Sequence, residues 1–450
     1  MNSLNNFNYS SNFVDSKDVH NVLSKYMLAD GFDMVLDLKA SNGAFLRDSK
    51  NNRDIIDFFS FFASMPIGMN HPKMNNDKII HTLGKIALNK PSNADIYTSE
   101  MATFVKTFFN IALPDYFKKA FFISGGALAV ENALKTAFDW KIRQNFRNGY
   151  TYEKGNKILH FQQAFHGRSG YTMSLTNTDI NKVKYFPKFD WPRVLNPKIK
   201  FPLDENNLAD VIEREKLSIA QIERAFLDNK DDIAAIIIEP IQGEGGDNHF
   251  RNEFLVELRN IADENQALLI FDEIQTGVGM TGKWWAHQHY DVKPDIMCFG
   301  KKMQICGIAV TDRIDNEPEN VFKVSSRINS TWGGNLIDMV RSTIYLEIIQ
   351  EDNLVDNAAK MGEYLISKMN EAQNLFPNLV SNIRGKGLFA AYDISSPENR
   401  KQFITNCYNE GLIILPCGEK SVRFRPVLDI DKETIDKGFE VINSSLKKLK

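Results

Sequence analysis

The chain has 450 residues, of which 43% are hydrophobic and 25% charged, and its formal net charge is −3. This length allows two or three domains with a large core, and the composition is typical of a soluble globular protein. The small net charge and the lack of a Lys/Arg block argue against nucleic acid or an anionic membrane as the main partner.

Cysteine usage and the N-terminal segment indicate where such a protein works. The four cysteines form no CxxC pair and have no His-rich segment beside them, so we expect reduced thiols and no metal site. The first residues, MNSLNNFNYSSNF, are polar and lack the apolar core of a secretory signal. The most apolar stretch, residues 58–69, is too short to span a bilayer. We therefore expect a cytoplasmic protein without a membrane segment.

The first elements end in a glycine turn. Residues 1–20 are rich in Asn and Ser and predict a loose arm, followed by a helix at 18–28 and a small meander of strands at 34–56. After a predicted helix at 100–109, a strand at 120–123 runs through Ser124-Gly125-Gly126-Ala127 into a helix at 130–144. Backbone N–H groups at such a helix start can bind an anion. A plain connection that needs glycine for its geometry is the alternative.

Two further strands, at 158–161 and 233–238, are each followed by polar residues. After the first come Phe165, Gly167 and Arg168, and an aromatic residue, a glycine and an arginine at this place could stack on a flat ring and bind a carboxylate. The alternative places Phe165 in the core and Arg168 on the surface. Four prolines predict an ordered loop at 185–204, and Glu239 follows the second strand.

A carboxylate and an amine end the next two strands. The strand at 268–271 leads into Asp272, and the strand at 295–299 leads into Gly300, Lys301 and Lys302. Ligands of open α/β sheets bind at the carboxyl ends of the strands. Pyridoxal 5′-phosphate needs a lysine for its Schiff base and an acid that keeps its ring nitrogen protonated. An ordinary salt bridge at the sheet edge is the alternative.

The pattern changes near residue 336. Helices are predicted at 337–349, 354–372 and 434–449, with short strands at 387–394, 412–415 and 422–428. We predict an N-terminal arm and part of a small domain at 1–70, a large domain at 71–335, and a C-terminal small α+β domain at 336–450.

The strand ends together resemble one family, the class III, fold-type I pyridoxal-phosphate aminotransferases. The resemblance covers the chain from about residue 22 to its end. It implies an α/β fold with a large, mostly parallel sheet domain and a smaller α+β domain. The motifs are GGA at 125–127, FHGR at 165–168, EPIQGEGG at 239–246, DEIQTG at 272–277, GKK at 300–302, STWGG at 330–334 and VRFRP at 422–426.

The resemblance assigns roles around the cofactor. Lys301 is similar to the Schiff-base lysine, with Lys302 as its rival, and Asp272 is similar to the partner of the ring nitrogen. Phe165 and Ile274 resemble the side chains on the two faces of the ring.

Other matched positions hold the rest of the cofactor. Gly126 and Ala127 resemble phosphate donors, and Gln275 resembles the side chain at the phenolic oxygen. Thr331 resembles a phosphate ligand from a second subunit, which implies a homodimer with a shared active site.

Runs such as NKPSNADIY, FPKFDWPR and GKKMQICG resemble the lysine-specific branch of this family. That branch implies transfer of the ε-amino group of L-lysine to 2-oxoglutarate, giving L-glutamate and 2-aminoadipate 6-semialdehyde, which cyclises to a piperideine carboxylate. Arg168 resembles the arginine that binds the lysine α-carboxylate, and Arg423 the one that binds the 2-oxoglutarate α-carboxylate. Glu244 matches the glutamate that covers Arg423 for lysine and swings away for the dicarboxylate, and Asn329 is expected to help position Glu244 or the substrate.

Two departures from the family pattern leave alternatives open. Met280 stands where many members have arginine, and MQICG at 303–307 replaces a glycine-rich segment. Ornithine, 4-aminobutyrate or β-alanine could replace lysine as the amino donor. The same fold could also serve an aminomutase, decarboxylase, racemase or non-catalytic binding protein, and Glu244 and Arg423 could form a fixed structural pair.

Overall fold

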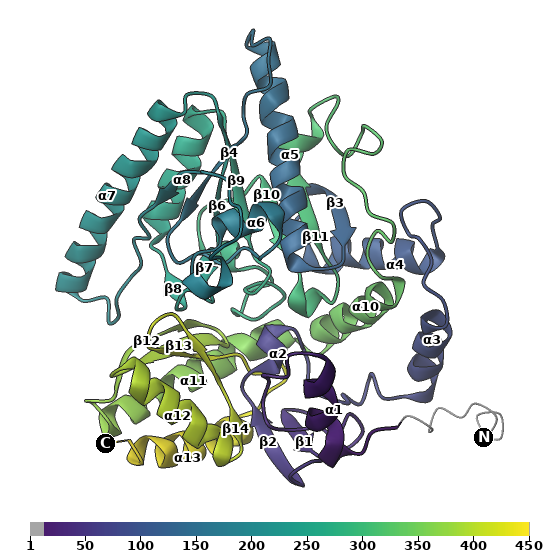
Figure 1. Ribbon diagram of the computed structural model, residues 1–450, viewed down its shortest axis with the longest axis vertical. Coiled ribbons are helices and arrows are strands. Elements are labelled where there is room, and N and C mark those ends of the chain that lie inside the picture. The colour runs from purple at the N-terminus through teal and green to yellow at the C-terminus, as the bar shows by residue number, and fades with distance from the viewer. Residues whose placement is uncertain (1–12, 450) are drawn as a thin grey trace.

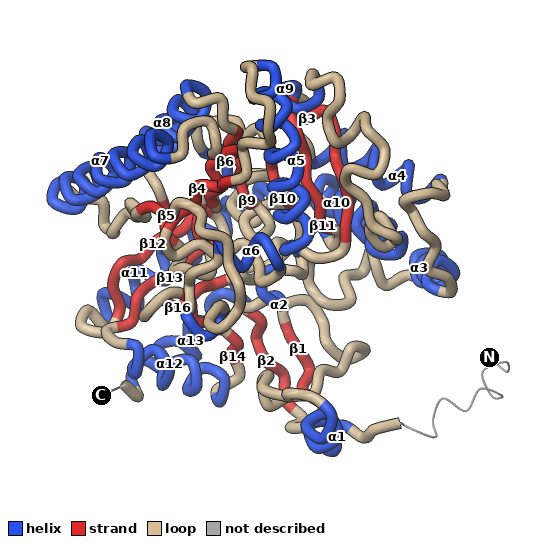
Figure 2. Tube along the Cα trace, turned by 45° about the horizontal axis from the view of Figure 1, so that its top comes forward, coloured by secondary structure: helices blue, strands red, loops and turns tan. Residues whose placement is uncertain are grey.

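The computed structural model describes residues 13–449, so the first twelve residues of the predicted arm lie outside the described part. A seven-stranded sheet forms its framework, in the order β3-β11-β10-β9-β6-β4-β5 (Figures 1 and 2). Strand β11 is antiparallel to both of its neighbours, and the other pairings are parallel. The strands are β3 (Phe117–Ile123), β4 (Lys157–Phe161), β5 (Arg193–Val194), β6 (Ile233–Ile238), β9 (Leu268–Asp272), β10 (Ile296–Phe299) and β11 (Cys306–Thr311).

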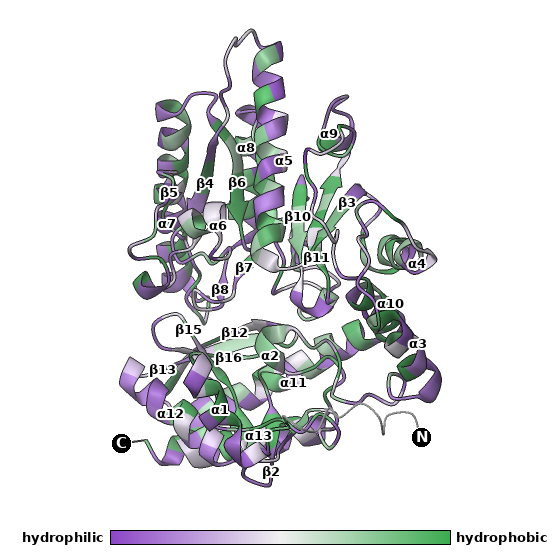
Figure 3. Ribbon diagram, turned by 45° about the vertical axis from the view of Figure 1, so that its right-hand side comes forward, coloured by the Kyte–Doolittle hydropathy of each residue, from purple (hydrophilic) through white to green (hydrophobic). Residues whose placement is uncertain are grey.

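Helices cover both faces of this sheet. Every residue of β6, IAAIII, and of β9, LLIFD, is buried, as expected for strands covered on both sides. One face packs against α5 (Gly126–Arg147). The other packs against α7 (Glu205–Asp228) and α8 (Asn252–Glu264). Figure 3 shows the contrast between the apolar strands β6 and β10 and the largely hydrophilic α7.

Two smaller sheets lie below the large one in Figure 1. Strand β2 pairs in parallel with β14, so segments near the two ends of the described chain share a sheet. The first sheet is β1 (Phe45–Asp48), β2 (Arg53–Asp57) and β14 (Leu412–Ile413); the second is β12 (Val380–Lys386), β13 (Phe389–Ile394), β16 (Ser421–Phe424) and β15 (Leu415–Cys417). The domain boundaries stay a prediction.

The remaining elements connect and cover these sheets. Among the described residues, no helix combines the length and apolar character needed to cross a bilayer. A two-stranded ribbon pairs β7 (Ile241–Gln242) with β8 (Asn248–His249). The helices are α1 (Val19–Tyr26), α2 (Ser60–Ala63), α3 (Asp77–Ala87), α4 (Ser99–Thr107), α6 (Gly170–Leu175), α9 (Asp312–Asp315), α10 (Leu336–Glu351), α11 (Leu354–Leu375), α12 (Pro397–Asn409) and α13 (Lys432–Lys447).

Several elements differ from the sequence prediction. Helix α7 was not predicted, although the Asp204 side chain caps it by accepting a hydrogen bond from the Asn207 backbone N–H at 2.9 Å. Helices α3 and α12 and strand β12 were also not predicted. The predicted loop at 185–204 contains β5, and the predicted strand at 422–428 ends at Phe424.

Candidate active site

The carboxyl ends of the parallel strands meet at a cavity of about 760 Å³. Residues that follow β3, β4, β6, β9 and β10 line it, because parallel neighbours end at one edge of the sheet. Nine of the residues predicted for the site line this cavity: Gly126, Ala127, Phe165, Arg168, Glu244, Asp272, Ile274, Gln275 and Lys301.

The glycine turn forms one wall. Gly125 has φ +106°, a conformation that favours glycine, and α5 begins at the next residue. The N–H groups of a first helical turn have no acceptor within the helix, so they remain available to an anion. A Cβ added to Gly126 would lie 3.2 Å from Cδ1 of Ile274, so a larger residue there would crowd the cavity wall.

The structure separates the two adjacent lysines. The Lys301 Nζ lies in the cavity and donates a hydrogen bond to the Phe62 carbonyl at 3.0 Å. The Lys302 Nζ is buried and donates to the Gln275 carbonyl at 2.7 Å and the Ala63 carbonyl at 3.2 Å. The available amine therefore belongs to Lys301.

The charge state of Lys301 follows from its surroundings. Burial, aided by the positive charges of Arg423 and Arg425, lowers the pKa of Lys301 from 10.5 to about 7. An amine with this pKa is about half unprotonated at pH 7, which suits a nucleophile or a base.

Asp272 is held by a residue to which the sequence assigned no role. Its Oδ2 lies 2.8 Å from Nδ1 of the buried His166, and its Oδ1 accepts a hydrogen bond from the Ile274 N–H at 3.1 Å. These contacts fix the carboxylate at the end of β9, facing the cavity. His166 lies within the FHGR motif, and this position could have indicated it.

Glu239 is a second buried carboxyl group whose role the sequence did not indicate. It follows β6 directly and accepts hydrogen bonds from the backbone N–H groups of Phe165 and Gly243, both at 3.0 Å. Burial raises the pKa of Glu239 from 4.5 to about 7. Glu239 thereby joins the loop that carries Phe165 to the loop that carries Glu244.

Of the two arginines predicted to bind carboxylates, Arg168 lines the cavity, whereas Arg423 does not and contacts Glu244, which does. Arg168 is exposed and lies at the cavity's surface. Arg423, on β16, is buried, and its Nη2 lies 3.0 Å from Oε2 of Glu244. The other oxygen of Glu244 forms an ion pair with the Nζ of Lys182, a residue for which no role was predicted. Although burial opposes it, the charges of Arg423 and Lys182 lower the pKa of Glu244, so this carboxylate stays ionised.

The loop that carries Glu244 is anchored by two other arginines. Arg425 forms an ion pair with Asp247, with Nη1 2.9 Å from Oδ2, and its Nη2 donates to Oε1 of Gln275 at 3.1 Å. Arg384 donates from Nη2 to the Gly246 carbonyl at 2.6 Å and from Nε to the Asp247 carbonyl at 2.9 Å. These contacts join the small four-stranded sheet to the loop that follows β7.

Thr331 and Asn329 do not line the cavity of their own chain. Both are exposed, on the loop before α10. The backbone carbonyl of Thr331 accepts a hydrogen bond from the Ser92 hydroxyl, and Oδ1 of Asn329 accepts one from the Ser330 N–H. Neither side chain forms a hydrogen bond with Glu244 in this structure, and the roles of Thr331 and Asn329 stay predictions.

The two departures from the family pattern have different surroundings. Met280 is fully buried in the main core cluster, and its carbonyl accepts a hydrogen bond from the Leu388 N–H at 2.9 Å. Its side chain packs in the core and does not line the cavity. Cys306, from the MQICG segment, lines the cavity beside Gly300.

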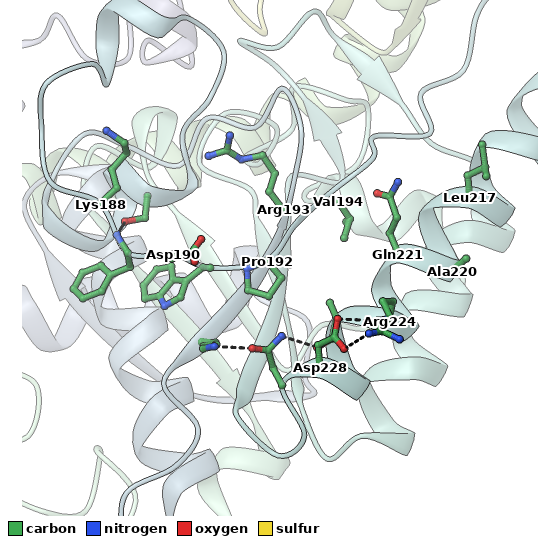
Figure 4. Close-up of a pocket in the computed structure, with 16 residues that line it drawn as sticks. Lys188, Asp190, Pro192, Arg193, Val194, Leu217, Ala220, Gln221, Arg224 and Asp228 are labelled. Carbon is green, nitrogen blue, oxygen red and sulfur yellow. Dashed lines mark hydrogen bonds and ion pairs between the residues drawn. The ribbon is translucent and has the colours of Figure 1, made fainter.

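A larger groove of about 1050 Å³ lies elsewhere, between α7 and the loop around Trp191 (Figure 4). Its charged groups include the ion pair of Arg224 with Asp228. None of the residues predicted for the active site lines this groove, so the cavity at the strand ends is the candidate active site.

Comparison with known proteins identifies the class. Residues 27–446 match the family Aminotransferase class-III, and the chain belongs to this family. The chain is 47% identical over 429 residues to an L-lysine-epsilon aminotransferase of Mycobacterium tuberculosis, covering 95% of each chain. It is 45% identical over 433 residues to an L-lysine-epsilon aminotransferase of Streptomyces clavuligerus, covering 96% of this chain and 94% of the other.

A solved structure confirms the predicted fold. A lysine aminotransferase from M. tuberculosis in the internal aldimine form superposes with a TM-score of 0.94 at 46% identity, covering 96% of this chain and 99% of the other. The family and this match also confirm pyridoxal 5′-phosphate as the cofactor. The cavity fits it, because it combines an amine of lowered pKa, a carboxylate fixed by a histidine and a helix start suited to phosphate.

Proposed function

We propose that the protein transfers the ε-amino group of L-lysine to 2-oxoglutarate, giving L-glutamate and 2-aminoadipate 6-semialdehyde, which cyclises to a piperideine carboxylate. The observation that carries the proposal is that Glu244 covers Arg423 at a cavity where Arg168 and Lys301 are both available. The two relatives described above, both named as L-lysine-epsilon aminotransferases, support lysine as the donor.

Each cofactor-facing residue has a proposed task. When bound, pyridoxal phosphate supplies an electron sink for the carbon that loses its proton. Lys301 provides the amine that holds the cofactor and then moves the proton at the substrate carbon. Asp272, fixed by His166, keeps the ring nitrogen protonated.

Shape and polar donors position the ring. Phe165 and Ile274 come from the loops after β4 and β9 and line the cavity, where they would flank the two faces of the ring. Gly126 and Ala127 would offer backbone N–H groups to the phosphate, and Gln275, which Arg425 holds, would hydrogen-bond the phenolic oxygen.

The two arginines divide the substrates by charge. Lysine places its α-carboxylate at Arg168 and its uncharged reacting amine at Lys301, and it has no second carboxylate for Arg423. The ion pair with Glu244 therefore keeps Arg423 neutralised during this half-reaction. 2-Oxoglutarate places its distal carboxylate at Arg168 and its α-carboxylate at Arg423, which Glu244 must first release.

The amino donor can be tested in single half-reactions. Holoenzyme is mixed with lysine, ornithine or 4-aminobutyrate while the cofactor absorbance is followed. Lysine should discharge the absorbance of the aldehyde form, and trapping of the cyclic imine should show that the ε-nitrogen left. Faster conversion by ornithine or 4-aminobutyrate would contradict the proposed donor. Isomerised lysine without keto acid would identify an aminomutase, and release of carbon dioxide a decarboxylase.

Replacement of Glu244 tests the division between substrates. Glu244→Ala leaves the buried Arg423 without its carboxylate partner, so the lysine half-reaction should slow by about tenfold or more, and more than the 2-oxoglutarate half-reaction. Single-turnover rates of the two halves measure this difference. Equal losses in both halves would indicate a fixed structural pair.

We also propose a homodimer whose sites are shared. Thr331 lies outside its own cavity, and the surface near it exposes the apolar side chains of Ile96, Tyr97 and Trp332. A second copy of the chain would cover such a surface, and the Thr331 of each subunit would then reach the cofactor phosphate in the other subunit.

Mixing two inactive variants tests this sharing. A hybrid of Lys301→Ala and Thr331→Ala subunits has one intact site if Thr331 acts in its neighbour, so refolding the two together should restore activity. No restoration in hybrids shown to be dimeric by ultracentrifugation would contradict the shared site.

A further inference from the structure

Glu244 bridges two cations that come from different parts of the chain. Its Oε2 lies 3.0 Å from Nη2 of Arg423 on β16, and its Oε1 pairs with Nζ of Lys182, which follows α6. The Lys182 ammonium also lies 5.4 Å from the centroid of the Phe165 ring, within the range of a cation–π contact. Lys182 is therefore held between the gating carboxylate and the aromatic side chain of the cofactor site.

Release of Arg423 would change the surroundings of Glu244. The Glu244 side chain is only 26% exposed. Its ionised carboxylate would be destabilised there if it lost both cations, because little water could replace them. Lys182 removes part of that destabilisation, because one oxygen of Glu244 is already paired with it. When a substrate carboxylate takes Arg423, Glu244 can turn away while it keeps a positive partner.

We propose that Lys182 is a specificity-determining residue that retains Glu244 in the open position and so favours dicarboxylate substrates. This inference rests on the proposed function, in which Glu244 must leave Arg423 for 2-oxoglutarate. Lys182 acts through Glu244 and is a positioning residue.

Loss of Lys182 should affect the two substrates differently. Without it, Glu244 has Arg423 as its cation partner among the contacts described, so the closed pair becomes harder to open. The rate of the 2-oxoglutarate half-reaction should therefore fall. The rate of the lysine half-reaction, which uses the closed pair, should change far less. This pattern is opposite to the one expected for Glu244→Ala, and a general loss of folding would reproduce neither.

A non-reacting dicarboxylate measures opening without turnover. Glutarate is titrated into holoenzyme by calorimetry for the wild type, Lys182→Met and the control Lys184→Met. Lys184, two residues after Lys182, is exposed, and its ammonium lies near the Tyr185 ring. We expect the glutarate Kd to rise about tenfold in Lys182→Met, as for loss of one charged hydrogen bond, and to be unchanged in the control. The single-turnover rate with lysine should fall by a much smaller factor than the tenfold loss in glutarate affinity.

A double variant with Glu244→Ala tests whether Lys182 acts through Glu244 or contacts the dicarboxylate directly. If Lys182 works through Glu244, adding Lys182→Met to Glu244→Ala should leave the glutarate Kd unchanged. A further tenfold loss there would show that Lys182 contacts the dicarboxylate directly and would overturn the proposal, as would equal affinity of Lys182→Met and wild type. Failure of the proposed function would appear separately, as wild-type holoenzyme that does not react with lysine.

Discussion

The lowered pKa of Lys301 predicts how the apoenzyme takes up its cofactor as pH changes. With a pKa of about 7, roughly half of the Lys301 amines are unprotonated at pH 7, against about one in 3,000 for a lysine with the ordinary value of 10.5. Only the unprotonated amine attacks the pyridoxal aldehyde. The rate of covalent incorporation should therefore rise about tenfold per pH unit below pH 7 and level off above it.

Stopped-flow absorbance of apoenzyme mixed with pyridoxal phosphate between pH 5.5 and 9 measures this profile. Cofactor binding to Lys301→Ala, monitored by fluorescence, gives the pH dependence that the cofactor and the cavity contribute without the lysine amine. This profile is used to correct the wild-type rates. Arg423→Gln removes one of the charges that lower the pKa of Lys301, so it should move the inflection to higher pH. A corrected rate that still rises steeply through pH 9 would refute the reasoning, because Lys301 would then titrate as an ordinary lysine.

Two further predictions concern buried groups near the cofactor. His166→Ala removes the 2.8 Å contact with Asp272, so the dissociation constant of pyridoxal phosphate, measured by fluorescence titration, should rise at least about tenfold; an unchanged constant would show that Asp272 needs no support. Glu239 should make stability depend on pH, because burial raises its pKa from 4.5 to about 7 and the folded protein binds this proton more tightly than the unfolded chain. Its stabilising contribution is complete below pH 4.5 and lost as pH rises to about 7, so Glu239→Gln should gain up to about 3 kcal/mol relative to wild type between pH 4.5 and 8. Denaturant unfolding at both pH values tests this, and a constant difference would contradict it.

The sequence predicted the central strands well because both of their faces are covered. The predicted strand at 233–238 has the bounds of β6, and the strand at 268–271 lacks only the last residue of β9. Helix α7 was not predicted, although its buried positions Val211, Ser218, Ile222 and Phe226 recur at helical spacing and Asp204 caps its start.

The candidate site could be predicted where its residues directly follow strands. Asp272 and Lys301 follow neighbouring parallel strands, and the order of strand ends along the chain was enough to place them together. Lys182 could not be predicted in this way, because it comes from a loop and reaches Glu244 only through the fold. The partner of the buried Arg425, Asp247, is 178 residues away in the chain, and no local pattern indicates such a pair.

The anchored loop that carries Glu244 determines how the gate can work. Arg384 holds the backbone carbonyls of Gly246 and Asp247, and Arg425 holds the Asp247 carboxylate, two and three residues beyond Glu244, which moves in the proposed function. In the proposed function, exchange between an amino acid and a dicarboxylate is then made by rotation of the Glu244 side chain on a loop that is held in place. One fixed loop would thus serve the two chemically unlike substrates of the proposed reaction in alternation, with the side chain of Glu244 as its moving part.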